Sequence, residues 1–457
     1  MKKTENILSE KTIIILFILF ITILIVQCYL LTVFTPLDMD DSHYLYIGKL
    51  ISRGFIPYKD FICVHPPASM GIAGIFFRLG FDVTGVQVLF AFINLLILFL
   101  VYFLSKKFTE DKYLPLFAVL LLTVSTGYFT YAIRTVSLRH LAVVFILWAV
   151  IQFFNKKYFR SGIIFALAGL TIFLSYPVII LFLIVFSVFF PKNIKDYLKT
   201  FTGFISLTLL FFFIFSFVPG FWDSIITFQM SMISKLYVSK TSVLKTCFKI
   251  NYIPFIFFII GFITIFIKKQ KKELLAFSVW GIAVFLSFFL LGGRTSVQNF
   301  HLLIPVFCIT GGASFSLVKN KNLKLIFLIL LTISSLTYHI TLGLKPEITS
   351  EGHYIMDISL CKTLASVPQP IQTGRSPMIA LKSGIELPVW YYGTDFYYFE
   401  HSDSWKTPGN WDQMLKNTKS ILYQNGFFKF MPQKVKEEIA RDFMPVKTEN
   451  TLIFIKK

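Results

Sequence analysis

The sequence predicts a polytopic α-helical membrane protein with about 11 transmembrane helices and a small C-terminal α/β domain. Three observations carry this prediction. Of the 457 residues, 55% are hydrophobic and only 15% are charged, whereas about a quarter of the residues in a soluble globular protein are charged. The mean hydropathy is +0.70. The apolar residues also gather in runs of membrane-spanning length. This composition excludes a soluble enzyme, a disordered chain and a disulfide-rich scaffold.

The first apolar run extends from Thr12 to Phe34 and follows three lysines, Lys2, Lys3 and Lys11. It is long enough to span a bilayer, and no small-residue cleavage site follows it. The run therefore predicts a retained first helix with a cytoplasmic N-terminus, rather than a cleaved signal peptide. Further apolar runs lie at 84–104, 114–131, 137–154, 161–175, 177–190, 198–218, 252–267, 274–292, 301–318 and 323–343.

The adjacent runs 161–175 and 177–190 are each shorter than the roughly 20 residues that a full span needs. Tyr176-Pro177 marks the break between them. Basic segments at 155–160 and 191–199 flank the pair, and such segments are typical of the cytoplasmic face. An even number of crossings must then separate the two segments, which predicts a short hairpin of two helices.

The distribution of charge predicts the orientation in the membrane. The net charge is +20, and residues 1–344 hold 30 Lys and Arg against 12 Asp and Glu, while residues 345–457 hold 14 against 12. Of the 30, 19 lie at 1–11, 105–113, 155–160, 191–199, 268–273 and 319–322, with Lys324 at the edge. These segments are predicted to be cytoplasmic, in a multi-pass protein of a bacterial cell membrane. Without a basic stripe or a binding motif, nucleic acid is not expected as a partner.

Two domains follow from this pattern. Residues 1–344 form the transmembrane domain, whose first outer loop spans 35–69, and residues 345–457 form an extracytoplasmic α/β domain. The strands expected in the second domain are Met378–Leu381, Ser420–Tyr423 and Thr451–Ile455, and the expected helix is Pro432–Phe443.

The five cysteines have no spacing typical of metal ligands, so no metal site is predicted from them. Cys28 and Cys308 lie in apolar runs and are interpreted as small core residues. Cys63, Cys247 and Cys361 could supply one disulfide at most, and the sequence leaves the pairing open.

Carboxylates on the predicted outer face gather in one place. Six of the 12 acidic residues before position 345 lie in predicted cytoplasmic segments, and five of the other six lie between the first two spans. These five are Asp38, Asp40, Asp41, Asp60 and Asp82. An enzyme that needs a carboxylate at the outer face would find it here.

A helix is expected over 41–53, because Tyr44, Ile47, Gly48 and Ile51 share one face at helical spacing. With one apolar face, this helix is predicted to lie along the membrane surface. It would hold Asp40 and Asp41 at its beginning, with Lys49 and Arg53 further along it. Aspartate is also a favoured N-cap residue, so either carboxylate could only cap the helix.

The first outer loop contains the pattern Asp40-Asp41-x-x-Tyr44, followed by Lys49, Gly54, Pro57-Tyr58 and His65-Pro66-Pro67. In these residues it resembles the first outer loop of the GT-C glycosyltransferases, and in particular the group of protein mannosyltransferases and lipid A aminoarabinose transferases. About 11 helices, short cytoplasmic turns and a soluble C-terminal domain agree with that architecture. The family often has Asp-Glu in place of Asp40-Asp41, and Lys in place of His65. A second acidic site that some members carry after the third span has no counterpart in 134–139.

The resemblance implies an inverting glycosyltransferase. It would move a sugar from a polyprenyl-phosphate donor to a lipid, glycan or protein acceptor at the outer face of the membrane. Asp40 would be the catalytic base, with Asp41 second. A phosphate leaves in this reaction, so no general acid is needed, and cations nearby would stabilise its charge. No cofactor is predicted; a divalent metal could be held near the aspartates, but no ligand set is complete.

Several cations on the predicted outer side are candidates for binding the lipid phosphate. They are Lys49, Arg53, Lys59, Arg134, Arg139 and Arg294, with His65 as a further candidate. For each of the six the alternative is snorkelling to the membrane interface. For His65 the alternative is a turn residue that orders Pro66-Pro67. The segment Phe221–Ser239 is interpreted as an interfacial helix.

Two other classes of function compete with a transferase. A membrane transporter or a lipid or glycan flippase would carry ionisable residues within the spans and related halves. The predicted spans are nearly free of acids, and the halves show no visible similarity. A membrane-anchored assembly protein would leave the clustered carboxylates unexplained.

Overall fold

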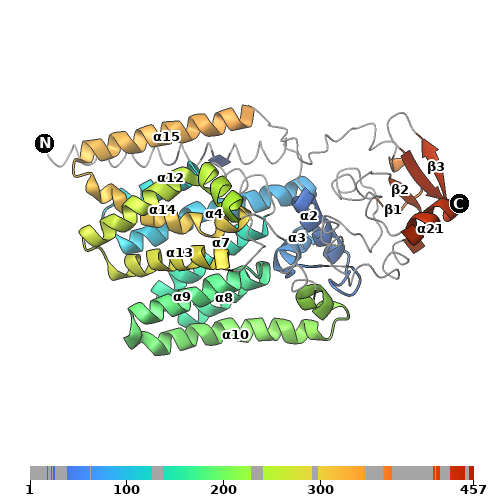
Figure 1. Cartoon of the computed structure of the whole chain (residues 1–457), viewed down its shortest axis with the longest axis horizontal. Helices are drawn as coiled ribbons and strands as arrows, with labels where there is room; N and C mark the ends of the chain where they lie inside the picture. Colours follow the sequence, from blue (N-terminus) through green and yellow to red (C-terminus); the bar gives the residue numbers. More distant parts are fainter. Residues whose placement is uncertain are drawn as a thin grey trace.

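The computed structural model describes residues 39–61, 63–125, 137–227, 240–290, 297–344, 364–372, 415–416, 418–422, 433–447 and 452–457, with residues 18, 22, 24 and 25. Two short helices, α2 (Met39–Ser52) and α3 (Ala68–Arg78), lie beside one end of a helix bundle (Figure 1). The helices of the bundle are α4 (Val83–Phe108), α5 (Leu114–Thr123), α7 (Leu138–Phe154), α8 (Tyr158–Thr171), α9 (Ser175–Phe189), α10 (Ile194–Ser216), α12 (Lys240–Ile267), α13 (Lys272–Leu290), α14 (Ile304–Gly312) and α15 (Lys321–Leu344).

Each apolar run between 84 and 343 overlaps a described helix, so the mainly helical class of the chain is confirmed. Among the described residues, three helices are long and apolar enough to cross a membrane: Val83–Phe108, Pro191–Ser216 and Lys240–Ile267. Shorter apolar helices accompany them in the bundle. The predicted total of about 11 spans stays a prediction, because nearly all of the first run, 12–34, lies outside the described residues.

The predicted hairpin at 161–190 is present as two separate helices, but the break is not at Tyr176-Pro177. Helix α8 ends at Thr171, Ile172 is extended, and α9 already begins at Ser175. Pro177 lies in the first turn of α9, where the backbone N–H has no helical partner, so the proline ring is tolerated there.

Helices α8 and α10 approach so closely that their glycines cannot be replaced without moving backbone. A Cβ atom on Gly162 of α8 would lie 1.9 Å from the carbonyl oxygen of Thr200, and one on Gly203 of α10 would lie 2.2 Å from that of Phe159. Both helices start at the same end of the bundle, because Phe153 at the end of α7 contacts both Tyr158 in the first turn of α8 and Tyr197 in the first turn of α10. The contact therefore sets their first turns side by side.

Aromatic side chains fill the interior between α7, α9 and α13. Phe182 packs edge-on against Phe153 and Trp280, with ring centroids 5.3 Å apart in both pairs. The indole N–H of Trp280 donates a hydrogen bond to the Val178 carbonyl at 2.9 Å, so no buried donor is lost. This cluster joins helices that are about 100 residues apart in the sequence.

The C-terminal part contains a four-stranded sheet with the order β1-β2-β4-β3. Its strands are β1 (Ile371–Gln372), β2 (Ser420–Leu422), β3 (Phe443–Lys447) and β4 (Leu452–Lys456), with helix α21 (Gln433–Asp442) beside them. β1 and β2 are parallel, and the other pairs are antiparallel. The predicted strands at 420–423 and 451–455 and the helix at 432–443 are confirmed, while Met378–Leu381 lies outside the described residues.

We expect Gly162→Ala to destabilise the protein, because the added methyl group would overlap the Thr200 carbonyl. Overpacking of this kind typically costs about 1–3 kcal/mol. Gly71→Ala in α3 is the matched control, since a Cβ there meets no atom within 4 Å. Thermal unfolding of the purified protein in detergent should show a lower midpoint for Gly162→Ala only. Equal midpoints would contradict the close contact.

Candidate active site

The two candidate carboxylates lie at the start of α2. This helix begins at Met39, so Asp40 and Asp41 belong to its first turn, as predicted. Their side chains lie outside what the structure describes. The first turn of a helix has free backbone N–H groups and the positive end of the helix dipole, both of which stabilise a carboxylate in its ionised form.

Helix α2 is covered on more than its apolar face, and its position along the membrane surface stays a prediction. Residues 42–48 and Leu50 are all buried, and only Lys49 in this stretch is partly exposed. Helix α3 packs against α2 at Gly48, where a Cβ would lie 2.7 Å from the Cβ of Ala73. The apolar face at helical spacing is real, but α3 and the bundle also cover the polar face. The sequence pattern could not show this, because it does not record what packs on a face.

His43 is a residue that the sequence argument missed. It follows Asp40 by three positions on α2, and it is only 4% exposed. Burial lowers the pKa of His43 to about 4, so its imidazole is neutral at pH 7. A neutral imidazole can still donate or accept a hydrogen bond. The sequence signal for it was the spacing of three residues from Asp40, which places both on one side of the helix.

His65 lies over the same helix. Its ring meets the ring of Tyr44 edge-on, with centroids 5.8 Å apart. Its backbone carbonyl accepts hydrogen bonds from the Tyr58 hydroxyl at 3.0 Å and from the Cys63 thiol at 3.2 Å. Pro66-Pro67 then lead directly into α3. The His65 backbone thus orders the turn, while its side chain is half-buried near the beginning of α2.

Tyr58 anchors the loop to the bundle. It is 3% exposed, has a positive φ of 72°, and packs edge-on against Phe215 and Phe221. Burial raises the pKa of Tyr58 well above its ordinary value, so its hydroxyl stays a donor. Gly220 makes the approach possible, since a Cβ there would lie 2.7 Å from the Tyr58 carbonyl oxygen.

The cations predicted in this loop differ in their surroundings. Lys49 is partly exposed and follows Asp41 by two helical turns, whereas Arg53 and Lys59 are exposed. Asp60 does not face a cation in the described structure; its carboxylate accepts a hydrogen bond from the Ile56 backbone N–H at 2.7 Å. This hydrogen bond closes the turn at 56–60.

Arg139 lies at the start of α7, where η3 (Val297–Leu302) packs against it. Its Nε donates to the side-chain oxygen of Asn299 at 3.3 Å, although 160 positions separate the two residues. The buried rings of His140 on α7 and His301 on η3 stack with centroids 5.4 Å apart. Arg134 and Arg294, which precede these two segments, lie outside the described residues.

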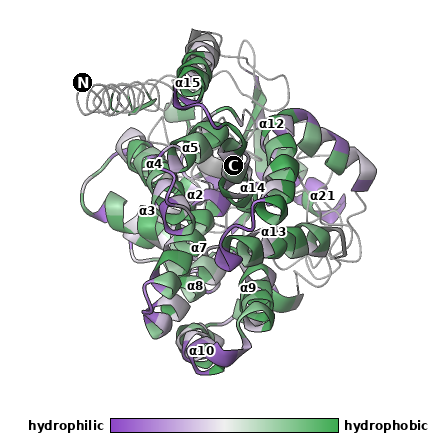
Figure 2. Ribbon diagram, turned by 90° about the vertical axis from the view of Figure 1, so that its left-hand side faces the viewer, coloured by the Kyte–Doolittle hydropathy of each residue, from purple (hydrophilic) through white to green (hydrophobic). Residues whose placement is uncertain are grey.

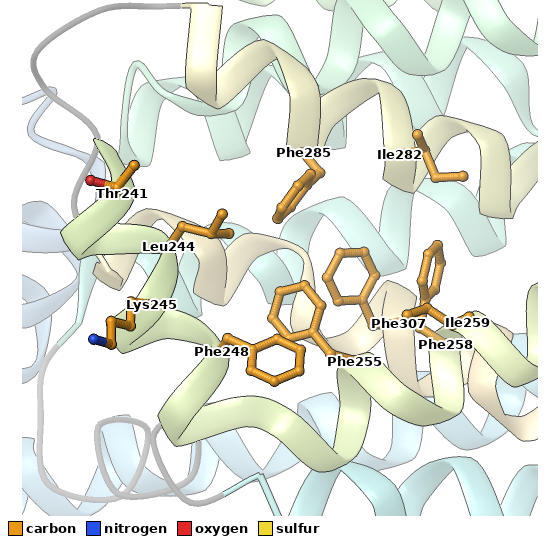
Figure 3. Close-up of a pocket in the computed structure, with 10 residues that line it drawn as sticks. All are labelled: Thr241, Leu244, Lys245, Phe248, Phe255, Phe258, Ile259, Ile282, Phe285 and Phe307. Carbon is orange, nitrogen blue, oxygen red and sulfur yellow. The ribbon is translucent and has the colours of Figure 1, made fainter. Parts of the chain in front are cut away.

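A second missed feature is an apolar groove along α12. It has a volume of about 540 Å³ and is shown in Figure 3. Phenylalanines from α12, α13 and α14 line it, and Lys245 lies at one end. The lining residues are Thr241, Leu244, Lys245, Phe248, Phe255, Phe258, Ile259, Ile282, Phe285 and Phe307.

A kink in α12 shapes this groove. The backbone of Asn251 leaves the helical conformation, with φ −128° and ψ 27°, and Pro254 follows it. The Asn251 side chain is buried, accepts a hydrogen bond from Ser125 at 2.6 Å and donates one to the Cys247 carbonyl at 3.2 Å. Lys245 precedes the kink, so a hydropathy run that began at 252 could not include it.

The segment 221–239 was predicted to be interfacial. Its described part, Phe221–Thr227, places Phe221 and Ile225 in the protein interior, at 0% and 1% exposure, while Trp222 is exposed. Its beginning is thus a packing element for the loop, and residues 228–239 lie outside the described residues.

The described cysteines do not form a disulfide. Cys63, Cys247 and Cys308 are buried free thiols, and Cys28 and Cys361 lie outside the described residues. Within the described part of the chain, no group of three or more His, Cys, Asp or Glu side chains is placed to hold a metal ion.

Comparison with known proteins identifies the fold. No model of a protein family matches the chain, and no curated protein matches it in sequence. Two solved structures of ArnT from Cupriavidus metallidurans are similar to it, one bound to undecaprenyl phosphate and one in the apo state. Both have a TM-score of 0.66, at 10% and 11% sequence identity respectively. The matches cover 97% and 96% of this chain and 98% and 97% of the ArnT chains. The chain therefore has, over nearly its whole length, the fold of ArnT.

Proposed function

We propose that the protein is an inverting glycosyltransferase that moves a sugar from a polyprenyl-phosphate donor to a lipid, glycan or protein acceptor at the outer face of the membrane. The observation that carries the proposal is the shared fold with an ArnT structure bound to undecaprenyl phosphate. The first loop adds residue-level support, since two aspartates begin a buried helix at one end of the bundle.

Asp40 is the proposed base, with Asp41 second. A carboxylate of ordinary pKa is ionised at pH 7, so it can accept the proton of the acceptor as the acceptor attacks the anomeric carbon. The bond between that carbon and the phosphate oxygen then breaks, and direct displacement inverts the centre. Because phosphate is a good leaving group, a second carboxylate acting as acid is not required, unlike in glycoside hydrolysis.

Cations take up the negative charge that gathers on the leaving phosphate. Lys49 on α2 and Arg134 are the first candidates in this role. Arg139 is a further candidate for binding the phosphate. Its Nε–H donates a hydrogen bond to Asn299, so the two terminal nitrogens of its guanidinium can still donate to an anion.

The groove along α12 suits the hydrocarbon part of such a donor. Its walls are almost wholly apolar, and a lysine lies at one end, where a lipid phosphate would sit. Ligand sites commonly combine an apolar cleft with a few placed polar groups. A transporter or flippase is the alternative, but the described carboxylates lie in loops, at helix ends and in the C-terminal part, rather than in mid-span positions where such proteins carry them.

Asp40→Asn should abolish transfer while expression and donor binding stay largely intact. Asparagine keeps the shape of the side chain and can still cap a helix, but it cannot accept a proton at neutral pH. General-base catalysis contributes about 10²–10⁴ in rate, and that factor should be lost. The measurement is turnover of surface glycans or lipids by mass spectrometry, together with the thermal midpoint.

Asp41→Asn is the control for this assignment and should reduce turnover less. If Asp40→Asn kept near-normal turnover while Asp41→Asn was inactive, the two roles would be exchanged. If both variants stayed active, the carboxylates would be helix caps and the transferase proposal would lose its residue-level support.

Replacing Lys49 or Arg134 by alanine should weaken the use of the lipid-linked donor more than it harms folding. A leaving phosphate needs fixed positive charge, whereas a cation at the membrane interface contributes little to stability. Kinetics at varied donor concentration should show the loss, beside an unchanged thermal midpoint. Unaltered kinetics in both variants would assign these side chains to the membrane interface.

Lys245→Ala should weaken the binding of undecaprenyl phosphate by about tenfold, because one charge-assisted contact of roughly 1.4 kcal/mol would be lost. Lys249→Ala is the matched control: this lysine is exposed on the same helix one turn away and does not line the groove. Titration of each purified variant with undecaprenyl phosphate, followed by thermal shift, compares them. Equal affinity in the two variants would argue against the groove as the lipid site.

A further inference from the structure

The end of the bundle opposite to α2 and α3 is strongly basic. The connections between its helices meet there, and Figure 2 views the molecule from this side. Exposed basic residues occur in every one of the described connections at this end. They are Lys106, Lys107, Lys112, Lys156, Lys157, Arg160, Lys192, Lys195, Lys199, Lys268, Lys269, Lys271, Lys272, Lys319 and Lys321.

Two of these connections form one cluster. The segments 155–160 and 191–199 each carry three basic residues, and Asp196 is their only acid. The close contact of α8 and α10 through Gly162 and Gly203 fixes the starts of the two helices side by side. The rings of Phe153 and Tyr197 stack between them, with centroids 5.7 Å apart. The two triplets of cations are therefore held at a fixed spacing.

This cluster places cations at two positive helix ends. Lys157 and Arg160 lie at the N-terminal end of α8, and Lys195 lies in the first turn of α10. The N-terminal end of a helix is itself positive and favours anions. Neither helix start has a side-chain cap. Two positive helix ends, six cations and one carboxylate thus converge on one exposed surface.

The lysines in the α12–α13 and α14–α15 connections, at the same end of the bundle, have different surroundings. Lys268 and Lys269 follow the C-terminal end of α12, where a cation is favourable. Lys319 and Lys321 lie next to that connection, since Gln270 donates a hydrogen bond to the Ser316 hydroxyl at 3.0 Å. Lys321 begins α15, but the Asn320 side chain caps that helix by accepting hydrogen bonds from the backbone N–H groups of Asn322 and Leu323 at 2.8 and 3.3 Å. These four lysines therefore satisfy the charge rule for a cytoplasmic face without facing an uncapped helix start.

We propose that the starts of α8 and α10 bind the headgroup of an anionic phospholipid that carries two phosphates. One phosphate lies at each helix start, between the backbone N–H groups and the basic side chains of that connection. The acyl chains lie along the exposed apolar surface of α10, which includes Leu198 and Phe201. The proposal rests on the orientation proposed above, in which this end faces the inner leaflet.

The test uses the full-length protein in detergent and native mass spectrometry with added cardiolipin or phosphatidylcholine. One variant carries Lys156→Gln, Lys157→Gln, Lys192→Gln and Lys195→Gln. The matched control carries Lys268→Gln, Lys269→Gln, Lys319→Gln and Lys321→Gln, which removes the same charge from the same face. Cardiolipin should bind the wild type and the control more tightly than phosphatidylcholine, and its affinity for the first variant should fall at least about tenfold.

Three results would overturn the proposal. An equal loss in both variants would mean that the whole basic face attracts lipid by charge alone. An unchanged affinity in the first variant would remove the cluster as the site. Displacement of cardiolipin by inorganic pyrophosphate at equal concentration would mean that a soluble anion is the ligand.

Two measurements keep this outcome separate from the transferase proposal. Undecaprenyl phosphate should bind the first variant as it binds the wild type, because the groove along α12 does not involve these lysines. Labelling of a single cysteine introduced at position 193 should occur only after the cells are lysed. Labelling of intact cells would place this end outside and overturn both the orientation and the lipid site.

Discussion

The contact between α2 and α3 is the constraint on which the candidate site depends. At Gly48 the helices approach so closely that a Cβ would meet the Cβ of Ala73 at 2.7 Å and the Met70 carbonyl oxygen at 3.1 Å. On the α3 side, a Cβ added to Gly74 would lie 3.0 Å from the Gly48 carbonyl oxygen. A helix of only 14 residues has little stability of its own, so this packing is what holds its first turn, with Asp40 and Asp41, in place.

The loop that joins these helices carries strain, and the bundle compensates for it. Tyr58 has a positive φ, which for a non-glycine residue costs about 1–3 kcal/mol. Its buried ring contacts Phe215 and Phe221, and its hydroxyl holds the carbonyl of His65. Strain of this kind persists only where the surroundings determine the backbone. Here it connects the end of α10 to the turn that leads into α3, so the loop is part of the bundle rather than an appendage.

The sequence predicted what depends on local pattern and missed what depends on contacts across the chain. Apolar runs located the helices, because hydropathy over about 20 residues is a local property. They could not show that α2 is buried on its polar face, nor that Pro177 lies in the first turn of α9, which begins at Ser175. The Arg139–Asn299 contact joins residues 160 positions apart, and no periodicity records it. Lys245 was overlooked because the kink at Asn251 separates it from the apolar run.

Retention of the ArnT fold at 10% sequence identity has a physical reason. In a bilayer, lipid tails are as apolar as the side chains that they touch, so most positions on outward faces accept any apolar residue. Exposed phenylalanines such as Phe103 on α4 and Phe213 on α10 occupy such positions. What limits sequence change is close packing, as at Gly162 and Gly203, where backbone lies against backbone. Function adds a second limit in the polar loops. A shared fold with a divergent sequence is therefore expected, and the residues that carry function must be sought in the loops and at the close contacts rather than in the apolar faces.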